Sequence, residues 1–470
     1  MSKKDKTMSA QERLEQLGYK QELNRSLSVT GNVTMTTANA SPIMAIFVLA
    51  IAPLVVTGTA TAGAALFQGI LVLLIGLTLA ELGSIYPVSG GTYSIIRYVL
   101  PKPLTYLGIA SFVLISLITP PSIAIGVATY VQLLFPQLPQ TAFATSCIAA
   151  VCLIFALMVG LSSIATSDKM TKVLMAMQAI LIAVLFYIFL ANPQRDVTEV
   201  VFSPQVLNEL GTALIPGSIS VVLASIGMLF GVIGGYDAAL GFSEETKGSC
   251  KNIAKAVIIS SVVTVIFMVT PIILSMVAAP DLLAYLQAKS PLLYTVQSYL
   301  GSTGTTLVNI GVLIAAFNAT VMLIVWQARI LYTGARDRAF PDFIAKQMMK
   351  VSGKAQVPWV ATAFICIASI ILVFASSLVA LVTFGAILFS VMFLLVAVAS
   401  IISRMKEPNI ERPFKMPLFP LIPIVVIIGL SIAIFAQPLN DILTAAGFYG
   451  LALLYYFVYI RPRDKREKQS

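Results

Sequence analysis

Histidine is absent from this chain of 470 residues, and charged residues are scarce. Without histidine, no proton relay, metal site or catalytic triad in the chain can use an imidazole. Asp, Glu, Lys and Arg make up 11% of the residues, whereas a soluble domain carries roughly 25%. A chain of this length with so few charges could not cover itself with polar surface in water. We therefore expect lipid to be its surroundings.

Cysteine is also rare, and its spacing excludes further classes of site. No pair among Cys147, Cys152, Cys250 and Cys366 has the spacing of zinc ligands, so we expect neither a metal site nor a disulfide framework. No cofactor is implied. The polar residues 1–25 contain no apolar run before a small-residue cleavage site, so they do not form a signal peptide.

What the sequence has in abundance is long apolar runs. Hydrophobic residues are 58% of the chain, and they gather in stretches of about twenty, the length that a helix needs to cross a bilayer. The two-residue alternation of a barrel strand is missing. Because lipid offers no partners to backbone N–H and C=O groups, the spans must be helices. The prediction is an all-α polytopic membrane protein with about twelve transmembrane helices. They are expected at 29–52, 64–85, 104–134, 141–163, 170–192, 214–241, 252–278, 303–333, 357–375, 377–402, 418–436 and 440–460.

The basic residues sort to one side of these spans. With both termini inside, only Arg195 and Lys289 of the 30 Lys and Arg residues fall outside, which leaves 28 inside. This bias predicts that both termini are cytoplasmic and that the cell membrane holds the protein. The same bias accounts for the net charge of +10, so this charge does not indicate a nucleic-acid partner. We expect an N-terminal tail over 1–26, a transport core over 27–403, two further spans over 404–460 and a basic tail over 461–470.

Two spans carry residues that interrupt a helix. In the first span, Pro42 lacks an N–H and disfavours helical angles in Ser41, so this stretch is expected to unwind near mid-membrane. A proline kink packed by its neighbours is the alternative. The sixth span contains Gly231, Gly234 and Gly235, and each glycine weakens a helix by about 1 kcal/mol. Close helix packing would also explain these glycines, but it would not explain the adjacent Asp237.

The two interruptions lie in spans one and six. Five spans separate them, and an odd number reverses orientation, so spans one to five and six to ten are expected to form an inverted repeat. Paired broken helices at equivalent positions indicate the binding site of a transporter. Free N–H groups at the start of a half-helix suit a carboxylate, and free carbonyl groups suit a cation or an ammonium group.

Few acidic groups lie within or beside the membrane. An ionisable group inside a span costs roughly 3 kcal/mol unless it faces protein or water, so each is a candidate for coupling or gating. They are Asp237 in the sixth span, Glu81 at the end of the second, and Glu244 and Glu245 at the end of the sixth. The last two are expected either to pair with basic loops near Arg97, Arg329 or Arg336, or to lie solvated at the interface.

Several segments resemble a known family. Residues 80–93 (AELGSIYPVSGGTY), 235–239 (GYDAA) with 243–247 (SEETK), and 328–341 (ARILYTGARDRAFP) are similar to signatures of amino-acid permeases. Residues 17–23 (LGYKQEL) look like the amino acid/choline (GABA-permease-like) branch. These segments are spread along the chain from residue 17 to residue 341. The resemblance is to the amino acid–polyamine–organocation (APC) superfamily, whose members have the leucine-transporter fold.

This resemblance implies a secondary transporter that works by alternating access. The amino and carboxylate groups of its substrate would bind the unwound parts of spans one and six. By position these are Ala40, Ser41, Pro42, Phe230, Gly231, Gly234, Tyr236 and Asp237. Selectivity for the side chain would come from spans three, eight and ten. The candidates there are Ser122, Ile125 and Asn318.

One departure from the family concerns coupling. Some proton-coupled members carry a lysine in the fifth span, and this chain has Gln178 at that place, which does not titrate. Asp237 then becomes the main titratable group in the membrane. It could carry a proton, pair with a substrate amine, or cap the second half of span six.

The sequence thus predicts a secondary active transporter of amino acids or related amines, driven by protons or by exchange. Its partners would be the small-molecule substrate, the lipid bilayer and, for coupling, protons. A polyamine or organic-cation transporter and a nutrient sensor of the same fold that does not transport are the alternatives. A channel would need charged rings or a carbonyl filter, and an enzyme would need a nucleophile with a base or a metal. The spans offer none of these.

Overall fold

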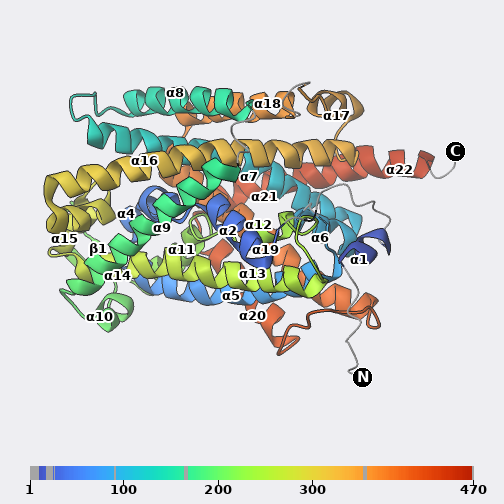
Figure 1. Ribbon diagram of the computed structural model, residues 1–470, viewed down its shortest axis with the longest axis horizontal. Coiled ribbons are helices and arrows are strands. Elements are labelled where there is room, and N and C mark those ends of the chain that lie inside the picture. Colours follow the sequence, from blue (N-terminus) through green and yellow to red (C-terminus); the bar gives the residue numbers. More distant parts are fainter. Residues whose placement is uncertain are drawn as a thin grey trace.

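A computed structural model describes residues 10–16, 25, 27–88, 91–162, 168–352 and 357–467. Most of the predicted N-terminal tail lies outside these residues, including residues 17–23, as do Ser89 and Gly90 of the permease-like signature, Lys354, and the last three residues of the basic tail. The described chain forms an elongated bundle in which most long helices run along the same axis (Figure 1).

Nine helices of the described chain are long and apolar enough to cross a membrane. Those made of one segment are α5 (Ala60–Ile85), α7 (Lys102–Leu134), α8 (Ala142–Gly160), α9 (Asp168–Ala191), α16 (Pro291–Arg336) and α19 (Leu378–Lys406). The others combine α-helical and π-helical (η) segments. These are α2 (Val29–Ala40), α3 (Pro42–Met44), η1 (Ala45–Leu49) and α4 (Ile51–Thr57); α13 (Cys250–Thr264), η3 (Val265–Val269) and α14 (Thr270–Ala278); and α21 (Leu439–Tyr455), η4 (Tyr456–Ile460) and α22 (Arg461–Glu467).

Three further apolar helices are shorter. They are α11 (Ile219–Leu229), α18 (Trp359–Ala375) and α20 (Leu421–Phe435). The predicted polytopic all-α membrane protein is confirmed, whereas the count of twelve spans and the inverted repeat stay predictions. The predicted start of span eight at residue 303 agrees with a break inside α16, where Gly301 has non-helical angles (φ 64°, ψ −166°).

The predicted start of span six at residue 214 is wrong. Residues Leu214–Pro216 form strand β2, which pairs antiparallel with strand β1 (Gln205–Leu207), and Gln205 lies opposite Pro216. Pro216 disfavours helical angles in Ile215, the residue before it, so the helix does not extend backward through this point. The helix α11 begins only after Ser218.

Short helices mark the two ends of the bundle (Figure 1). At one end lie α1 (Ala10–Gln16), α6 (Gly91–Val99), α17 (Asp342–Met348) and α22. At the other end lie α10 (Val197–Phe202), α15 (Leu282–Gln287) and the β1–β2 hairpin. We call the first the basic end, because Arg97, Lys346 and Arg463 lie on its helices. That this end faces the cytoplasm stays a prediction.

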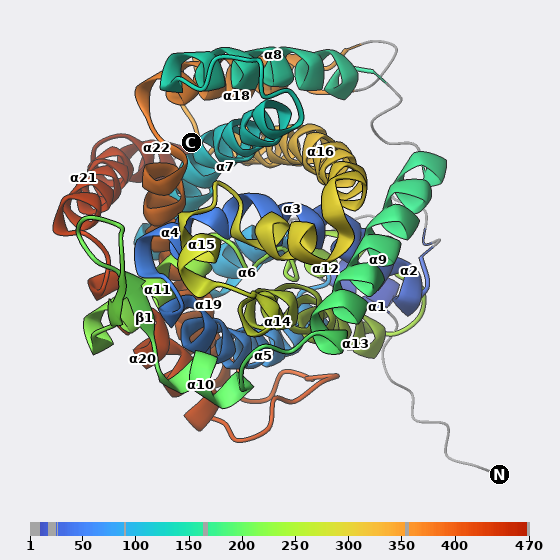
Figure 2. The ribbon, with the colours of Figure 1, turned by 90° about the vertical axis from the view of Figure 1, so that its left-hand side faces the viewer.

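Seen from the hairpin end, the helices surround a short central segment (Figure 2). The broken helix that contains α3 runs through the middle, and α5, α7, α16 and α19 lie around it. Helix α7 packs against α16 and α19, and α5 packs against α13. Helices α8 and α18 form a pair on one side of the bundle (Figure 2). This arrangement places the two interrupted spans inside the protein, away from lipid.

Candidate functional site

The first predicted interruption is present. Helix α2 ends at Ala40, and α3 begins at Pro42. Ser41 between them is left-handed (φ 45°, ψ 72°), a conformation that few residues other than glycine adopt. Pro42 explains the break, since it offers no N–H and disfavours helical angles in the residue before it. The restarted helix makes its first bond from Ala45 N to Ser41 O (3.0 Å), so the N–H groups of Ile43 and Met44 come before the hydrogen-bonded ladder.

The second interruption is longer. Helix α11 ends at Leu229, and the four-residue α12 (Ala238–Gly241) follows residues 230–237. Gly235 has φ +85°, which suits glycine and strains other residues. A Cβ atom built on Gly235 would lie 2.6 Å from the Cβ of Ala40 and 2.8 Å from its Cα. The two unwound segments therefore cross in direct contact, and the missing side chain of Gly235 permits this approach.

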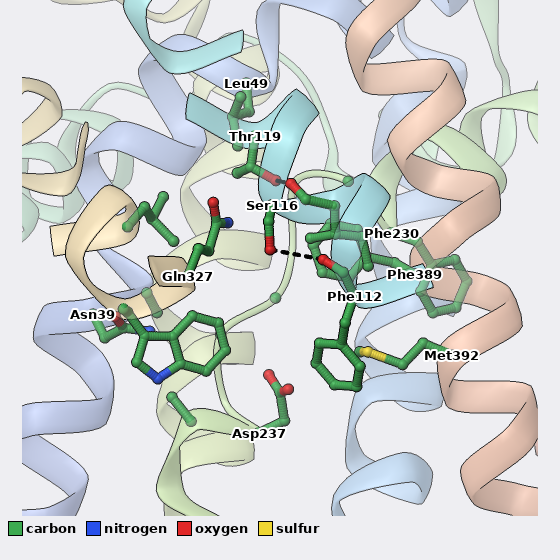
Figure 3. Close-up of a pocket in the computed structure, with 18 of the residues that line it drawn as sticks. Asn39, Leu49, Phe112, Ser116, Thr119, Phe230, Asp237, Gln327, Phe389 and Met392 are labelled. Carbon is green, nitrogen blue, oxygen red and sulfur yellow. Dashed lines mark hydrogen bonds between the residues drawn. The ribbon is translucent and has the colours of Figure 1, made fainter. Parts of the chain in front are cut away.

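A cavity opens beside this crossing (Figure 3). Measured as the space for the centres of water-sized molecules, its volume is about 90 Å3, several times what one water needs. Its walls come from both interruptions and from α7, α16 and α19. The lining residues are Asn39, Ala40, Met44, Leu49, Phe112, Ile115, Ser116, Thr119, Phe230, Gly231, Val232, Gly234, Gly235, Asp237, Ala238, Leu323, Trp326, Gln327, Ile330, Phe389 and Met392. Of the predicted substrate-binding residues, the structure brings together Ala40, Phe230, Gly231, Gly234 and Asp237.

Most of this wall is apolar, and its few polar groups are spaced apart. The rings of Phe112, Phe230 and Phe389 lie on one side of the cavity, next to Met392 (Figure 3). Ser116 donates to Phe112 O at 2.7 Å and Thr119 to Ile115 O at 2.8 Å, so each hydroxyl oxygen keeps lone pairs for a ligand.

Gln327 offers a further acceptor. Its Oε1 atom is buried and has no hydrogen-bond partner among the described residues. The described lining also includes the amide of Asn39 and the indole of Trp326. The cavity thus presents uncharged polar groups from Asn39, Ser116, Thr119, Trp326 and Gln327 between apolar walls.

Asp237 is the one charged side chain among the described residues that line the cavity. Its carboxylate points into the cavity (Figure 3). It accepts a hydrogen bond from Thr92 Oγ1 at 3.2 Å and has no ion-pair partner in the described part of the chain. Asp237 occupies the N-cap position of α12, but its side chain makes no capping hydrogen bond. The geometry therefore argues against the capping role and leaves a partly buried carboxylate facing the cavity.

Three predicted residues of the interruptions do not line the cavity. The side chain of Tyr236 is buried and stacks on Phe393, with ring centroids 5.7 Å apart. Ser41 points toward α9, where its Oγ atom donates to Gln178 Oε1 at 3.2 Å. Pro42 is buried and is absent from the lining. Ser41 and Gln178, predicted from different spans, thus contact each other and tie the first break to α9.

The predicted selectivity residues lie away from the cavity. Ser122 and Ile125 come later on α7 than the lining residues, the last of which is Thr119. On α16 the cavity begins at Leu323, more than a helical turn past Asn318. Sequence reasoning missed Ser116, Thr119 and Gln327. The pair Ser116 and Thr119 carried a signal, because polar residues three apart share one face of a helix in an otherwise apolar span.

Glu81 occupies a separate, fully satisfied cluster. Arg404 binds it with two hydrogen bonds (2.9 and 2.7 Å), Arg412 with one (3.2 Å), and Met416 N donates a fourth (2.7 Å). The side chains of Glu81 and Arg412 are only 1% and 5% exposed. The cluster joins the end of α5 to the segment between α19 and α20, and it contributes nothing to the cavity wall.

Further charged side chains meet at the basic end, where the pairing of Glu244 and Glu245 with basic loops stays a prediction. Arg97 forms an ion pair with Asp337, which also accepts a hydrogen bond from Tyr93 Oη (3.2 Å). Burial and the Asp337 charge raise the pKa of Tyr93 well above its usual value. Glu245 lies near Arg329, as expected. Burial raises the pKa of Glu245, and the charge of Arg329 opposes that rise.

Comparison with known proteins agrees with this architecture. A family model described as "Amino acid permease" matches residues 28–458. The branched-chain amino acid permease BcaP of Bacillus subtilis is 27% identical over 52% of this chain and 51% of its own length. The human large neutral amino acids transporter small subunit 2 is 24% identical over 74% of this chain and 63% of its own. The methylthioribose transporter of Bacillus subtilis is 22% identical over 88% of this chain and 90% of its own length. The chain thus spans between half and two thirds of the first two relatives.

Proposed function

We propose, from the premise that this chain belongs to the amino acid permease family, that it carries amino acids or related amines across the cell membrane by alternating access. The observation that carries the proposal is the partly buried Asp237 carboxylate, which faces a cavity whose described lining contains neither Lys nor Arg. A lone buried carboxylate is stable next to a cation, and the ammonium group of an amino acid supplies one.

The first interruption offers the complementary site. The N–H groups of Ile43 and Met44 lie at the start of a helix that runs on through η1 and α4. Such unpaired N–H groups, with the positive end of the helix dipole, favour a carboxylate. Because the two interruptions touch at Ala40 and Gly235, one α-amino acid can reach both groups. We propose that Asp237 binds its ammonium group and that the start of α3 binds its carboxylate.

The rest of the cavity sets the side-chain preference. Phe112, Ile115, Phe389 and Met392 form an apolar surface that would bury an aliphatic side chain at about 25 cal/mol per Å2. A charged substrate side chain would lack a partner of its own. The described lining has no basic residue for an acidic side chain, and its one acidic residue, Asp237, is already assigned to the ammonium group. We therefore propose neutral, apolar amino acids as substrates. This agrees with relatives whose names specify branched-chain and large neutral amino acids.

The energy source for transport depends on the titratable groups beside the cavity. Gln178 is buried on α9, bonded to Ser41, and does not titrate. Asp237 is then the group that can carry a proton with the substrate, and exchange of internal for external substrate is the other mode. An imposed proton gradient that drives uptake indicates the first mode, and stimulation by internal substrate alone indicates the second. The proposed topology places the basic end, with both termini, in the cytoplasm.

Binding tests the proposal through Asp237. In detergent, we expect leucine, isoleucine or another neutral amino acid to raise the melting temperature of the wild type. A ligand at a hundred times its Kd stabilises a protein by about 2.7 kcal/mol. We expect Asp237→Asn to remove that shift, because the amide cannot pair with the ammonium group. Glu209→Gln on an exposed outer loop should keep it.

The same measurement separates the rival hypotheses. Stabilisation by polyamines or quaternary amines, with none by amino acids, would favour the organic-cation transporter. Equal stabilisation of the wild type and of Asp237→Asn by amino acids would remove Asp237 from the site. Binding without uptake in liposomes would favour the sensor.

A further inference from the structure

A second cavity lies outside the transport cavity, between α7 and α21. Its volume, measured in the same way, is about 200 Å3. Ile109, Ala110 and Val113 of α7 face Phe448 and Ala452 of α21 across it. Its described lining is apolar or aromatic throughout. On α21 the neighbouring Leu451 and Leu454 are 61% and 59% exposed, as expected for a helix that faces lipid. We call this space the α7–α21 groove.

Near the basic end of the protein, the α7–α21 groove carries two tyrosine hydroxyl groups. Tyr106 and Tyr455 line it there, and Tyr455 Oη donates to Ala339 O at 3.2 Å. Arg463 follows on α22, where its Nη2 atom donates to Arg338 O at 2.8 Å, one residue from Ala339. Its guanidinium carbon lies 5.7 Å from the centroid of the Tyr459 ring. Arg463 thus stands at the mouth of the groove.

The hydrogen bonds of Arg463 are incomplete. Its Nε and Nη1 atoms are buried and have no hydrogen-bond partner among the described residues. Asp464, its acidic neighbour, forms an ion pair with Lys102 and comes only within 4.0 Å of Arg463 Nη2. Buried guanidinium N–H groups without acceptors are unfavourable, and a phosphate oxygen is a strong acceptor for one of them.

The surrounding charge favours an anion. Helix α22 carries Arg461, Arg463, Lys465 and Arg466 against Asp464 and Glu467. A basic cluster at the end of a lipid-facing groove is the arrangement that attracts anionic headgroups. The apolar groove offers an acyl chain a place to bury, and the Arg463 mouth offers its headgroup a partner.

We propose that the α7–α21 groove binds an anionic glycerophospholipid, with an acyl chain between α7 and α21 and the phosphate on Arg463. The site is also connected to the transport cavity. Phe340 lines both the groove and a small space that Phe112 also lines, and Phe112 in turn lines the transport cavity. A lipid chain in the groove therefore contacts Phe340, which also lines the small space next to Phe112.

Lipid titration of the full-length protein tests the site. The purified protein in detergent is titrated with phosphatidylglycerol or with phosphatidylcholine of the same acyl chains, and bound lipid is counted by native mass spectrometry. We expect the wild type to prefer phosphatidylglycerol. Arg463→Gln should weaken its binding roughly tenfold, the effect of losing a hydrogen-bonded charge. It should weaken phosphatidylcholine binding less, because the choline ammonium group already offsets the phosphate charge of that lipid. Arg466→Gln, an exposed residue on the same helix, should retain the preference.

A second pair of variants tests the groove itself. Ala452→Phe fills it and should reduce the occupancy of both lipids, whereas Leu451→Phe on the exposed face should not. The proposal is overturned if the wild type binds both lipids equally. It is also overturned if Arg466→Gln weakens binding as much as Arg463→Gln, or if Ala452→Phe leaves lipid occupancy unchanged.

Discussion

Replacing Gly235 by alanine is expected to abolish amino-acid binding and to lower the melting temperature of the protein. Gly235 has φ +85°, and its Cα faces Ala40, so a new Cβ atom would lie 2.6 Å from the Ala40 Cβ and 2.8 Å from the Ala40 Cα. The left-handed conformation costs roughly 1–2 kcal/mol for a residue with a Cβ, and overpacking adds typically about 1–3 kcal/mol. Separating the two unwound segments would also displace Asp237 from the start of α3.

The neighbouring glycine is the matched control for this change. A Cβ on Gly234 meets nothing within 4 Å, so Gly234→Ala should fold with nearly wild-type stability. Adding Ala40→Gly to Gly235→Ala removes the shortest contact and leaves the one to the Ala40 Cα, so we expect partial rescue. Wild-type amino-acid binding by Gly235→Ala would contradict the crossing of the two segments. A larger fall in melting temperature for Gly234→Ala than for Gly235→Ala would also contradict it.

The second large effect is expected at Glu81. Glu81→Gln removes the charge that holds Arg404 and Arg412, whose nearest nitrogens lie 2.7 and 3.2 Å from the carboxylate. Breaking a buried ion pair by removing one partner costs about 3–5 kcal/mol, because the remaining charges stay buried. Thermal melting in detergent should show a large fall relative to the wild type, and Glu209→Gln should show almost none.

This measurement also separates two roles for Glu81. A residue that only gates transport would change the uptake rate and leave the melting temperature unaltered. A residue whose hydrogen bonds hold α5 against the segment after α19 would, when replaced, lower the melting temperature of the protein. The four hydrogen bonds to Glu81 support the second role. Unchanged melting with altered uptake would contradict it.

Local backbone chemistry explains which parts of the site could be predicted from the sequence. Pro42 and the three glycines of span six interrupt helices through their own geometry, and both interruptions are present. Asp237 was predictable because a carboxylate in an apolar span needs a partner or a function. These residues required no knowledge of neighbouring helices.

Tertiary packing determined the rest. Whether a residue on α7 meets the cavity depends on the depth and rotation of that helix, which is why Ser116 and Thr119 line it and Ser122 does not. The partner of Glu81 lies 323 residues away on α19, and Arg97 pairs with Asp337 from the end of α16. Apolar periodicity alone also could not show that Leu214–Pro216 forms a strand instead of a helix.

Uptake by the purified protein tests the central claim most directly. The wild type, Asp237→Asn and Gly235→Ala are reconstituted into liposomes, and entry of radiolabelled leucine is followed with and without internal leucine or a proton gradient. The account predicts saturable uptake by the wild type, competition by other neutral amino acids, and loss in both variants. Folded wild-type protein that takes up no amino acid under either driving force would contradict it, as would undiminished uptake by Asp237→Asn.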